Sequence, residues 1–125
     1  MKTHALFQYI FDIPVYPSKV LVALYISPVC TAKEISEHTG ISRGKVYQTV
    51  QFLEDMGYVD RSERGVVKLR TSVVESKFRE GIEELSRMAD DLVALKRKAI
   101  QEKKEEVLKQ LRKIEELEKT LGEEE

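Results

Sequence analysis

The side chains best suited to binding chemistry in this 125-residue chain gather around residue 45. A predicted helix opens after Ser42, with Val46, Val50 and Leu53 at helical spacing as its buried stripe. Its solvent face carries a glycine and two amides, with cations in its first turn. Free backbone N–H groups at a helix start attract phosphate, and amide side chains pair with adenine edges. The pattern therefore predicts a helix that reads DNA, with Ser42, Arg43, Gly44, Lys45, Tyr47, Gln48 and Gln51 as its contacts.

A second group of cations follows on a predicted β-hairpin. Residues 58–61 and 66–70 are rich in strand formers, and the turn between them contains Gly65. Cations on such a hairpin suit backbone or minor-groove contacts, although a merely solvated hairpin looks the same. We expect DNA contacts from the hairpin at Arg61, Arg64, Lys68 and Arg70, and backbone contacts from Thr31 and Lys33.

Nothing in the sequence has the spacing of a catalytic or metal site. His4 and His38 are far apart, and Cys30 is the single cysteine, which excludes an intramolecular disulfide and fits a reducing compartment. We find neither a glycine-rich phosphate loop nor a nucleophile paired with a base. The sequence therefore predicts a protein that is not an enzyme, with no metal and no cofactor.

Short helices must position the predicted contacts. Prolines bracket a helix start near residue 15, and Thr31 and Glu34 form a capping box for a helix that ends before Gly40. Only Gly40 and Ile41 separate that helix from the one capped by Ser42, as in a helix-turn-helix. The fold class is therefore mostly α with a small β-hairpin, a winged helix-turn-helix. The aromatic segment 5–11 is ambiguous, and we expect it to cover Phe52 and Met56.

The C-terminal part, residues 71–125, reads as one long helix that opens with a second capping box at Ser72. Its apolar residues recur in steps of three and four, interrupted by the polar segment 101–106, and they have no partner within so short a chain. We expect a coiled-coil homodimer whose parallel or antiparallel sense stays open, with a charged C-terminus that frays. The predicted interface comprises Phe78, Ile82, Leu85, Leu92, Leu95, Leu111 and Ile114.

Composition supports two regions, a DNA-binding domain at 1–70 and a dimerisation helix at 71–125. The first has nine Lys and Arg against seven Asp and Glu, and the second has twelve against fifteen. No signal peptide or membrane-length apolar run is evident, so we expect a cytoplasmic protein with no membrane partner. The chain lacks Asn and Trp and is rich in Lys and Glu, as thermophile proteins are.

Three segments, 31–36, 40–47 and 53–59, together resemble the DNA-binding part of archaeal TrmB-type transcriptional regulators. The most family-like stretch runs from Arg43 through Lys45 to Tyr47, and the similarity spans roughly residues 15–70. The resemblance implies a winged helix that binds double-stranded DNA. Larger members of the family carry a sugar-binding domain after a helical linker, whereas this chain stops at the helix, so we expect no small-molecule effector.

These observations favour a sequence-selective transcriptional regulator that acts as a homodimer. Repression by occluding a promoter is the simplest mechanism, and activation stays open. Two other classes also stay open. One is an architectural chromatin protein that binds duplex DNA without sequence preference, and the other is a winged helix that binds proteins.

Overall fold

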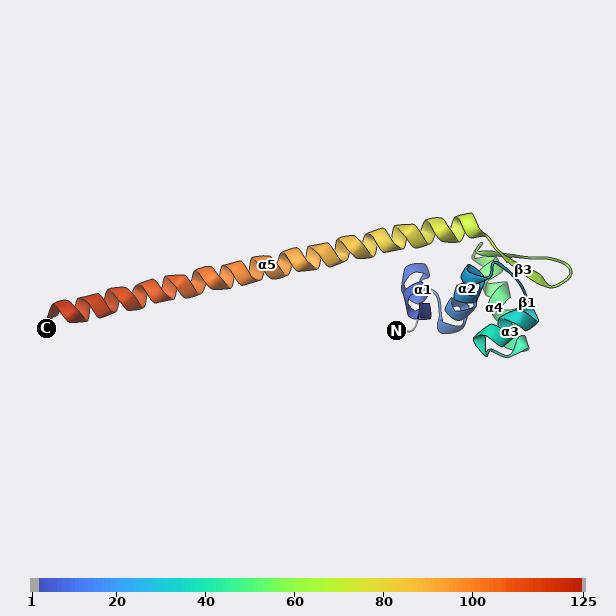
Figure 1. Cartoon of the computed structure of the whole chain (residues 1–125), viewed down its shortest axis with the longest axis horizontal. Helices are drawn as coiled ribbons and strands as arrows, with labels where there is room; N and C mark the ends of the chain where they lie inside the picture. Colours follow the sequence, from blue (N-terminus) through green and yellow to red (C-terminus); the bar gives the residue numbers. More distant parts are fainter. Residues whose placement is uncertain (1–2, 125) are drawn as a thin grey trace. The chain divides into compact units, whose positions relative to one another are not determined.

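The computed structural model describes residues 3–124 (Figure 1). In chain order the elements are α1 (Thr3–Phe11), α2 (Val15–Ile26), β1 (Val29–Thr31), α3 (Ala32–Thr39), α4 (Arg43–Asp55), β2 (Val59–Arg61), β3 (Val66–Leu69) and α5 (Thr71–Glu124). The protein is mostly helical with a small antiparallel sheet, which confirms the predicted fold class. Contacts divide the chain into Met1–Glu83, here called the head, and Glu84–Glu125, here called the tail.

The helix-turn-helix forms through the predicted caps. The Glu34 N–H donates to Thr31 Oγ1 (3.2 Å), and the Glu34 carboxylate accepts from the Thr31 N–H (3.1 Å). These two hydrogen bonds form a capping box at the start of α3. The Thr31 hydroxyl also donates to this carboxylate (3.1 Å). The hydrogen bonds that the carboxylate accepts, first from the backbone N–H and then from the hydroxyl of Thr31, lower the pKa of Glu34. At the other end of α3, Gly40 takes a left-handed φ of +74° that lets the chain turn into α4.

The hairpin belongs to a three-stranded sheet of order β1-β3-β2, all antiparallel. Strand β1 was not predicted, because its three residues, the last of which is the α3 cap Thr31, are too few for a periodic pattern. It pairs with β3 at Val29–Lys68, Cys30–Val67 and Thr31–Val66. Strand β1 joins the start of α3 to the hairpin by backbone hydrogen bonds. The predicted contacts at Thr31 and Lys33 are therefore fixed relative to those on the hairpin.

The aromatic N-terminus is helix α1, and it fills the head core rather than covering α4. Phe7 and Phe11 are buried, and the Phe7 ring contacts the rings of Tyr25 and Phe78 at centroid distances of 5.5 and 5.4 Å. The expectation that this segment covers Phe52 and Met56 is wrong, since they are 37% and 44% exposed. The segment contains too many apolar residues for its periodicity to reveal which face is buried.

Helix α5 begins at Thr71, one residue before the predicted cap. Ser72 therefore lies inside the helix, and the Glu75 carboxylate accepts from the Tyr25 hydroxyl (3.0 Å) and pairs with Arg79 instead of capping. The first turns of α5 pack into the head, where Val74 is fully buried. A Cβ on Gly81 would lie 2.6 Å from Ile10 Cγ2, so this glycine permits the close approach of α1.

Candidate nucleic-acid interface

The start of α4 is a capped and exposed helix N-terminus. The Ser42 side chain accepts from the Lys45 N–H (3.4 Å), and Ser42, Arg43 and Gly44 are all exposed. The remaining N–H groups of the first turn have no intrahelical acceptor, as in any α-helix. Phosphate oxygens are suitable partners for such N–H groups.

Helix α4 has one buried and one exposed face. Val46, Val50 and Leu53 are at most 1% exposed, and Thr49 is buried with its hydroxyl donating to the Lys45 carbonyl. The opposite face carries the predicted base-reading residues, all of which are exposed: Gly44, Tyr47, Gln48 and Gln51. The buried stripe predicted from the sequence is therefore confirmed for its three apolar members.

Two residues on this face are unobstructed by the protein. A Cβ built on Gly44 meets no atom within 4 Å, so packing within the chain does not require a glycine there. Gln48 is exposed, and no hydrogen bond joins its side chain to another of residues 3–124. Both positions are thus open to an approaching molecule.

A hydrogen bond that was not predicted from the sequence joins the side chains of Gln51 and Arg61. Arg61 Nη2 donates to Gln51 Oε1 (2.6 Å) and lies 3.6 Å from the Glu54 carboxylate. Gln51 in turn donates to Asp55 Oδ1 (3.0 Å). The network attaches β2 to the end of α4 and offsets part of the Arg61 charge. Its one sequence signal was the acidic pair at 54 and 55, beside a hairpin of basic residues.

The other hairpin cations differ in how far they are engaged. Arg64 is exposed in the turn that connects β2 and β3. Lys68 is exposed on β3 and lies opposite Asp60 of β2. Arg70 Nη1 donates to the Gly57 carbonyl (3.3 Å) and so stabilises the turn after α4. Of these three cations, Arg64 is the one most available to phosphate.

The remaining predicted contacts are Lys45 in the first turn of α4, and Thr31 and Lys33 at the start of α3. Lys45 Nζ lies 5.4 Å from the centre of the Tyr16 ring, a cation–π contact that links α4 to α2. Thr31 is held in the α3 capping box, whereas Lys33 is exposed. All the predicted DNA contacts therefore lie within the head.

The predicted dimer residues fall into two groups. Phe78 packs within the head against Phe7 and Tyr25, and Ile82 is 39% exposed. In the tail, the exposed fractions are 68% for Leu92 and 64% for Leu95. Leu85 is half-buried, and Leu111 and Ile114 are 48% and 51% exposed.

The candidate metal ligands and the single cysteine were also located in the structure. Among residues 3–124, no three His, Cys, Asp or Glu side chains are placed to hold a metal ion. Cys30 is buried, its thiol donates to the Ser27 carbonyl, and burial raises its pKa. No single helix in the described part is long and apolar enough to cross a membrane. Helices α1 and α2 reach that length and composition only as a pair bent by 108°, a criterion that buried core helices also meet.

Comparisons with known proteins agree on the fold. Residues 7–75 match the family model described as sugar-specific transcriptional regulator TrmB. No curated protein sequence is significantly similar to the chain. One similar solved structure is TrmBL2, titled an archaeal chromatin protein with a novel mode of DNA binding, at 22% identity and a TM-score of 0.53. The match covers 79% of this chain and 38% of that protein, so the chain spans well under half of its length.

A second similar structure is titled a possible transcriptional regulator from Methanosarcina mazei Go1. It is 12% identical with a TM-score of 0.50, and the match covers 74% of this chain and 87% of that one. At such identities the likeness concerns the fold. The family match spans more than half of the chain and includes α4 and the hairpin.

Proposed function

The chain belongs to the TrmB family of transcriptional regulators, and from that premise we propose that it reads specific DNA sequences as a homodimer. Its winged-helix head has the DNA-binding fold of that family. Sequence selectivity, the dimer and the regulatory outcome are the proposed parts. The exposed face of α4 is the observation that carries sequence selectivity, and the exposed apolar residues of the tail support the dimer.

Base reading is assigned to the first three turns of α4. Gln48 has no partner among the described residues, and its amide can form two hydrogen bonds with an adenine edge in the major groove. Gly44 lets the DNA backbone approach the helix closely, because nothing of the protein occupies the space beside it. Arg43 and the capped helix start would hold phosphate, which sets the register of the helix on the duplex.

The hairpin supplies contacts that do not depend on sequence. Arg64 is exposed in the β2–β3 turn, where a flanking phosphate or minor groove can reach it. Arg61 is held by Gln51 and Glu54, so we assign it a smaller part in binding than Arg64. Gln51 would act chiefly by positioning Arg61.

Dimerisation is assigned to the tail. Its large apolar side chains are exposed in the single chain, and their steps of three and four suit a coiled coil with a second copy. Two joined heads would place two α4 helices in successive major-groove segments. Bound over a promoter, such a dimer would exclude the transcription machinery, so repression is the simplest outcome.

Non-specific architectural binding is the second candidate, since one protein of similar fold is described as an archaeal chromatin protein. The two candidates differ in specificity ratio. Duplexes selected from a random library should bind at least about 10³-fold more tightly than unselected duplexes if the proposal holds. Equal, salt-dependent binding to both pools would favour the architectural role. An absence of salt-dependent DNA affinity would favour a protein-binding winged helix.

One variant tests the hairpin in the same titrations. Arg64→Ala should weaken selected and unselected duplexes alike and reduce the salt slope by about one unit. Arg87→Ala is the matched control, because Arg87 is exposed on α5 and outside the proposed DNA contacts. If Arg64→Ala left the salt slope unchanged, the hairpin would have no phosphate contact at this residue.

A further inference from the structure

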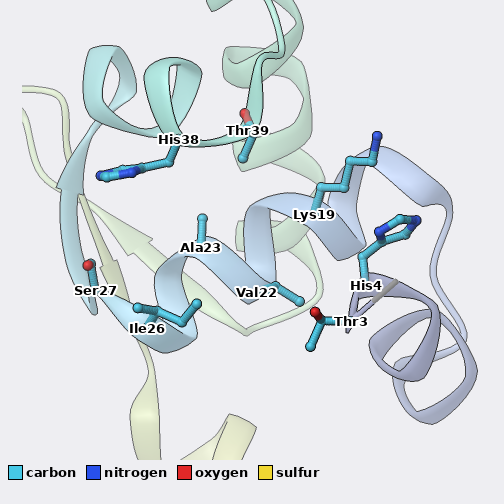
Figure 2. Close-up of a pocket in the computed structure, with 9 residues that line it drawn as sticks. All are labelled: Thr3, His4, Lys19, Val22, Ala23, Ile26, Ser27, His38 and Thr39. Atoms are coloured by element: carbon cyan, nitrogen blue, oxygen red, sulfur yellow. The ribbon is translucent and has the colours of Figure 1, made fainter. Parts of the chain in front are cut away.

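A cleft of about 340 Å³ lies between α1, α2 and α3 of the head (Figure 2), and none of its lining residues is a predicted DNA contact. Its floor is one side of α2, where Val22, Ala23 and Ile26 follow one another at helical spacing. Ile26 is 76% exposed, so it forms an open apolar edge of the cleft. Apolar lining of this kind favours an occupant with an apolar body.

The rim of the cleft is basic. His4 comes from α1, Lys19 from α2 and His38 from α3, and no lining residue is acidic. None of the three forms a salt bridge with another of residues 3–124, and Glu34, which interacts electrostatically with His38, is engaged in the α3 capping box. Figure 2 shows Lys19 and His4 together at one end of the cleft and His38 at the other. An uncompensated ammonium group beside an imidazole selects for an anion at the Lys19 end.

We propose that this cleft binds a small amphipathic organic carboxylate. The apolar body would lie on Val22, Ala23 and Ile26, and the carboxylate would face Lys19 and His4. The volume falls at the small end of ligand sites, which span about 300–1,000 Å³. The proposal goes beyond DNA binding and replaces the expectation, based on sequence, that the chain has no small-molecule effector.

The cleft adjoins the turn that leads into the DNA-reading helix. Thr39 lines it, and the Thr39 hydroxyl donates to the Ile35 carbonyl (2.7 Å) and accepts from the Ile41 N–H (3.3 Å). An occupant in contact with Thr39 therefore touches the residue that shapes the α3–α4 turn. A ligand bound here would alter the surroundings of Gly40 and Ile41 as well as the cleft.

Amide resonances of the isotope-labelled full-length protein test the site. The probes are hexanoate and 3-phenylpropanoate, each compared with its neutral amide and with the amine of equal length. Both carboxylates should shift the resonances of Val22, Ala23, Ile26, Gly40 and Ile41 saturably, and the amides and amines should bind at least tenfold more weakly. Equal affinity for the neutral amides, or no saturable shift with either carboxylate, would overturn the proposal.

Variants locate the binding without relying on DNA. Lys19→Gln should weaken the carboxylates about tenfold, and Ala23→Phe should abolish their binding by filling the cleft. Lys33→Gln is the matched control, since Lys33 is exposed on α3 but does not line the cleft. Should Ala23→Phe fail to fold, the affinity of the surface variant Lys19→Gln for the carboxylates still tests binding in the cleft. Undiminished affinity in Lys19→Gln would contradict the assigned carboxylate position.

Discussion

The head and the tail differ in whether the apolar residues of α5 are buried or exposed. Helix α5 carries apolar residues at steps of three and four through both units. In the head, Val74 is fully buried and Phe78 packs against the core, whereas in the tail Leu92 and Leu95 are more than 60% exposed. The spacing therefore predicts that the apolar residues pack against another element, but not whether that element belongs to the same chain.

Helix α1 accounts for the difference. It lies against the first turns of α5, with Ile10 beside Gly81 and Phe7 beside Phe78, and so gives these turns an intramolecular partner. No described element does the same for the tail. The head thus has a core of its own, and the exposed apolar residues of the tail are the ones that we propose join two copies.

Cutting the chain after Glu83 should have the largest effect on DNA binding. The head should stay folded and become monomeric, and its affinity for a selected duplex should fall by about 10²–10⁴, because two linked heads bind at a high effective concentration. The tail has ten Lys and Arg against twelve Asp and Glu, so charge alone would predict slightly tighter binding. Sedimentation equilibrium and duplex titration measure both outcomes. A truncated head that binds as tightly as the intact chain would refute the dimer.

Substituting one apolar residue in each unit distinguishes head stability from dimer formation. Phe78→Ala should destabilise the head by about 2–3 kcal/mol, less than a fully buried ring would, because Phe78 is half-buried. Leu92→Ala should leave head stability within about 0.5 kcal/mol while weakening the dimer. All five tyrosines lie in the head, so tyrosine fluorescence during urea unfolding reports that unit alone. Equal destabilisation of the head by both variants would contradict the division.

Two glycine substitutions should act in opposite directions. Gly81→Ala should destabilise the head by about 1 kcal/mol, since crowding against Ile10 exceeds the gain in helix propensity. Gly44→Ala should instead stabilise it by up to about 1 kcal/mol, since the space is open, and yet weaken DNA binding. Thermal unfolding and duplex titration of both variants provide the comparison. A Gly44→Ala protein with unchanged DNA affinity would show that DNA does not approach this turn.

The smallest expected effect concerns the capping box of α3. The pKa of Glu34 is lowered in the folded protein, so its contribution to stability is present above the unfolded value of about 4.3 and is lost as pH falls through the folded value. Glu34→Ala should therefore destabilise the protein at neutral pH, and the difference from the unsubstituted chain should vanish in acid. Urea unfolding across this pH range measures it. Glu34→Gln, which can keep the box, is the control, and a pH-independent difference for Glu34→Ala would contradict the assignment.

Local signals made most of the head predictable. The cap residues Thr31 and Ser42, the stop at Gly40 and the buried stripe from Val46 to Leu53 each depend on neighbours within one or two turns. Such features are encoded where they occur. The helix-turn-helix and the exposed face of α4 followed from them.

Features that depend on residues distant in sequence were not predictable. Strand β1 exists because β3 offers it hydrogen bonds, and α1 is oriented by contacts with Tyr25 and Phe78. The link between Arg61 and Gln51 also joins different elements, and it changes which hairpin cation is available to DNA. Charge and spacing alone did not distinguish an engaged arginine from a free one.

Base reading by α4 depends on the exposed amide of Gln48, and Gln48→Ala is the variant that tests it. Gln48 has no partner in the described chain, so its loss should leave folding unchanged. Binding to a selected duplex should weaken by about 1–3 kcal/mol, while binding to random duplexes and the salt slope should stay nearly constant. A ratio of selected to random affinity that is the same in Gln48→Ala and the unsubstituted protein would contradict it.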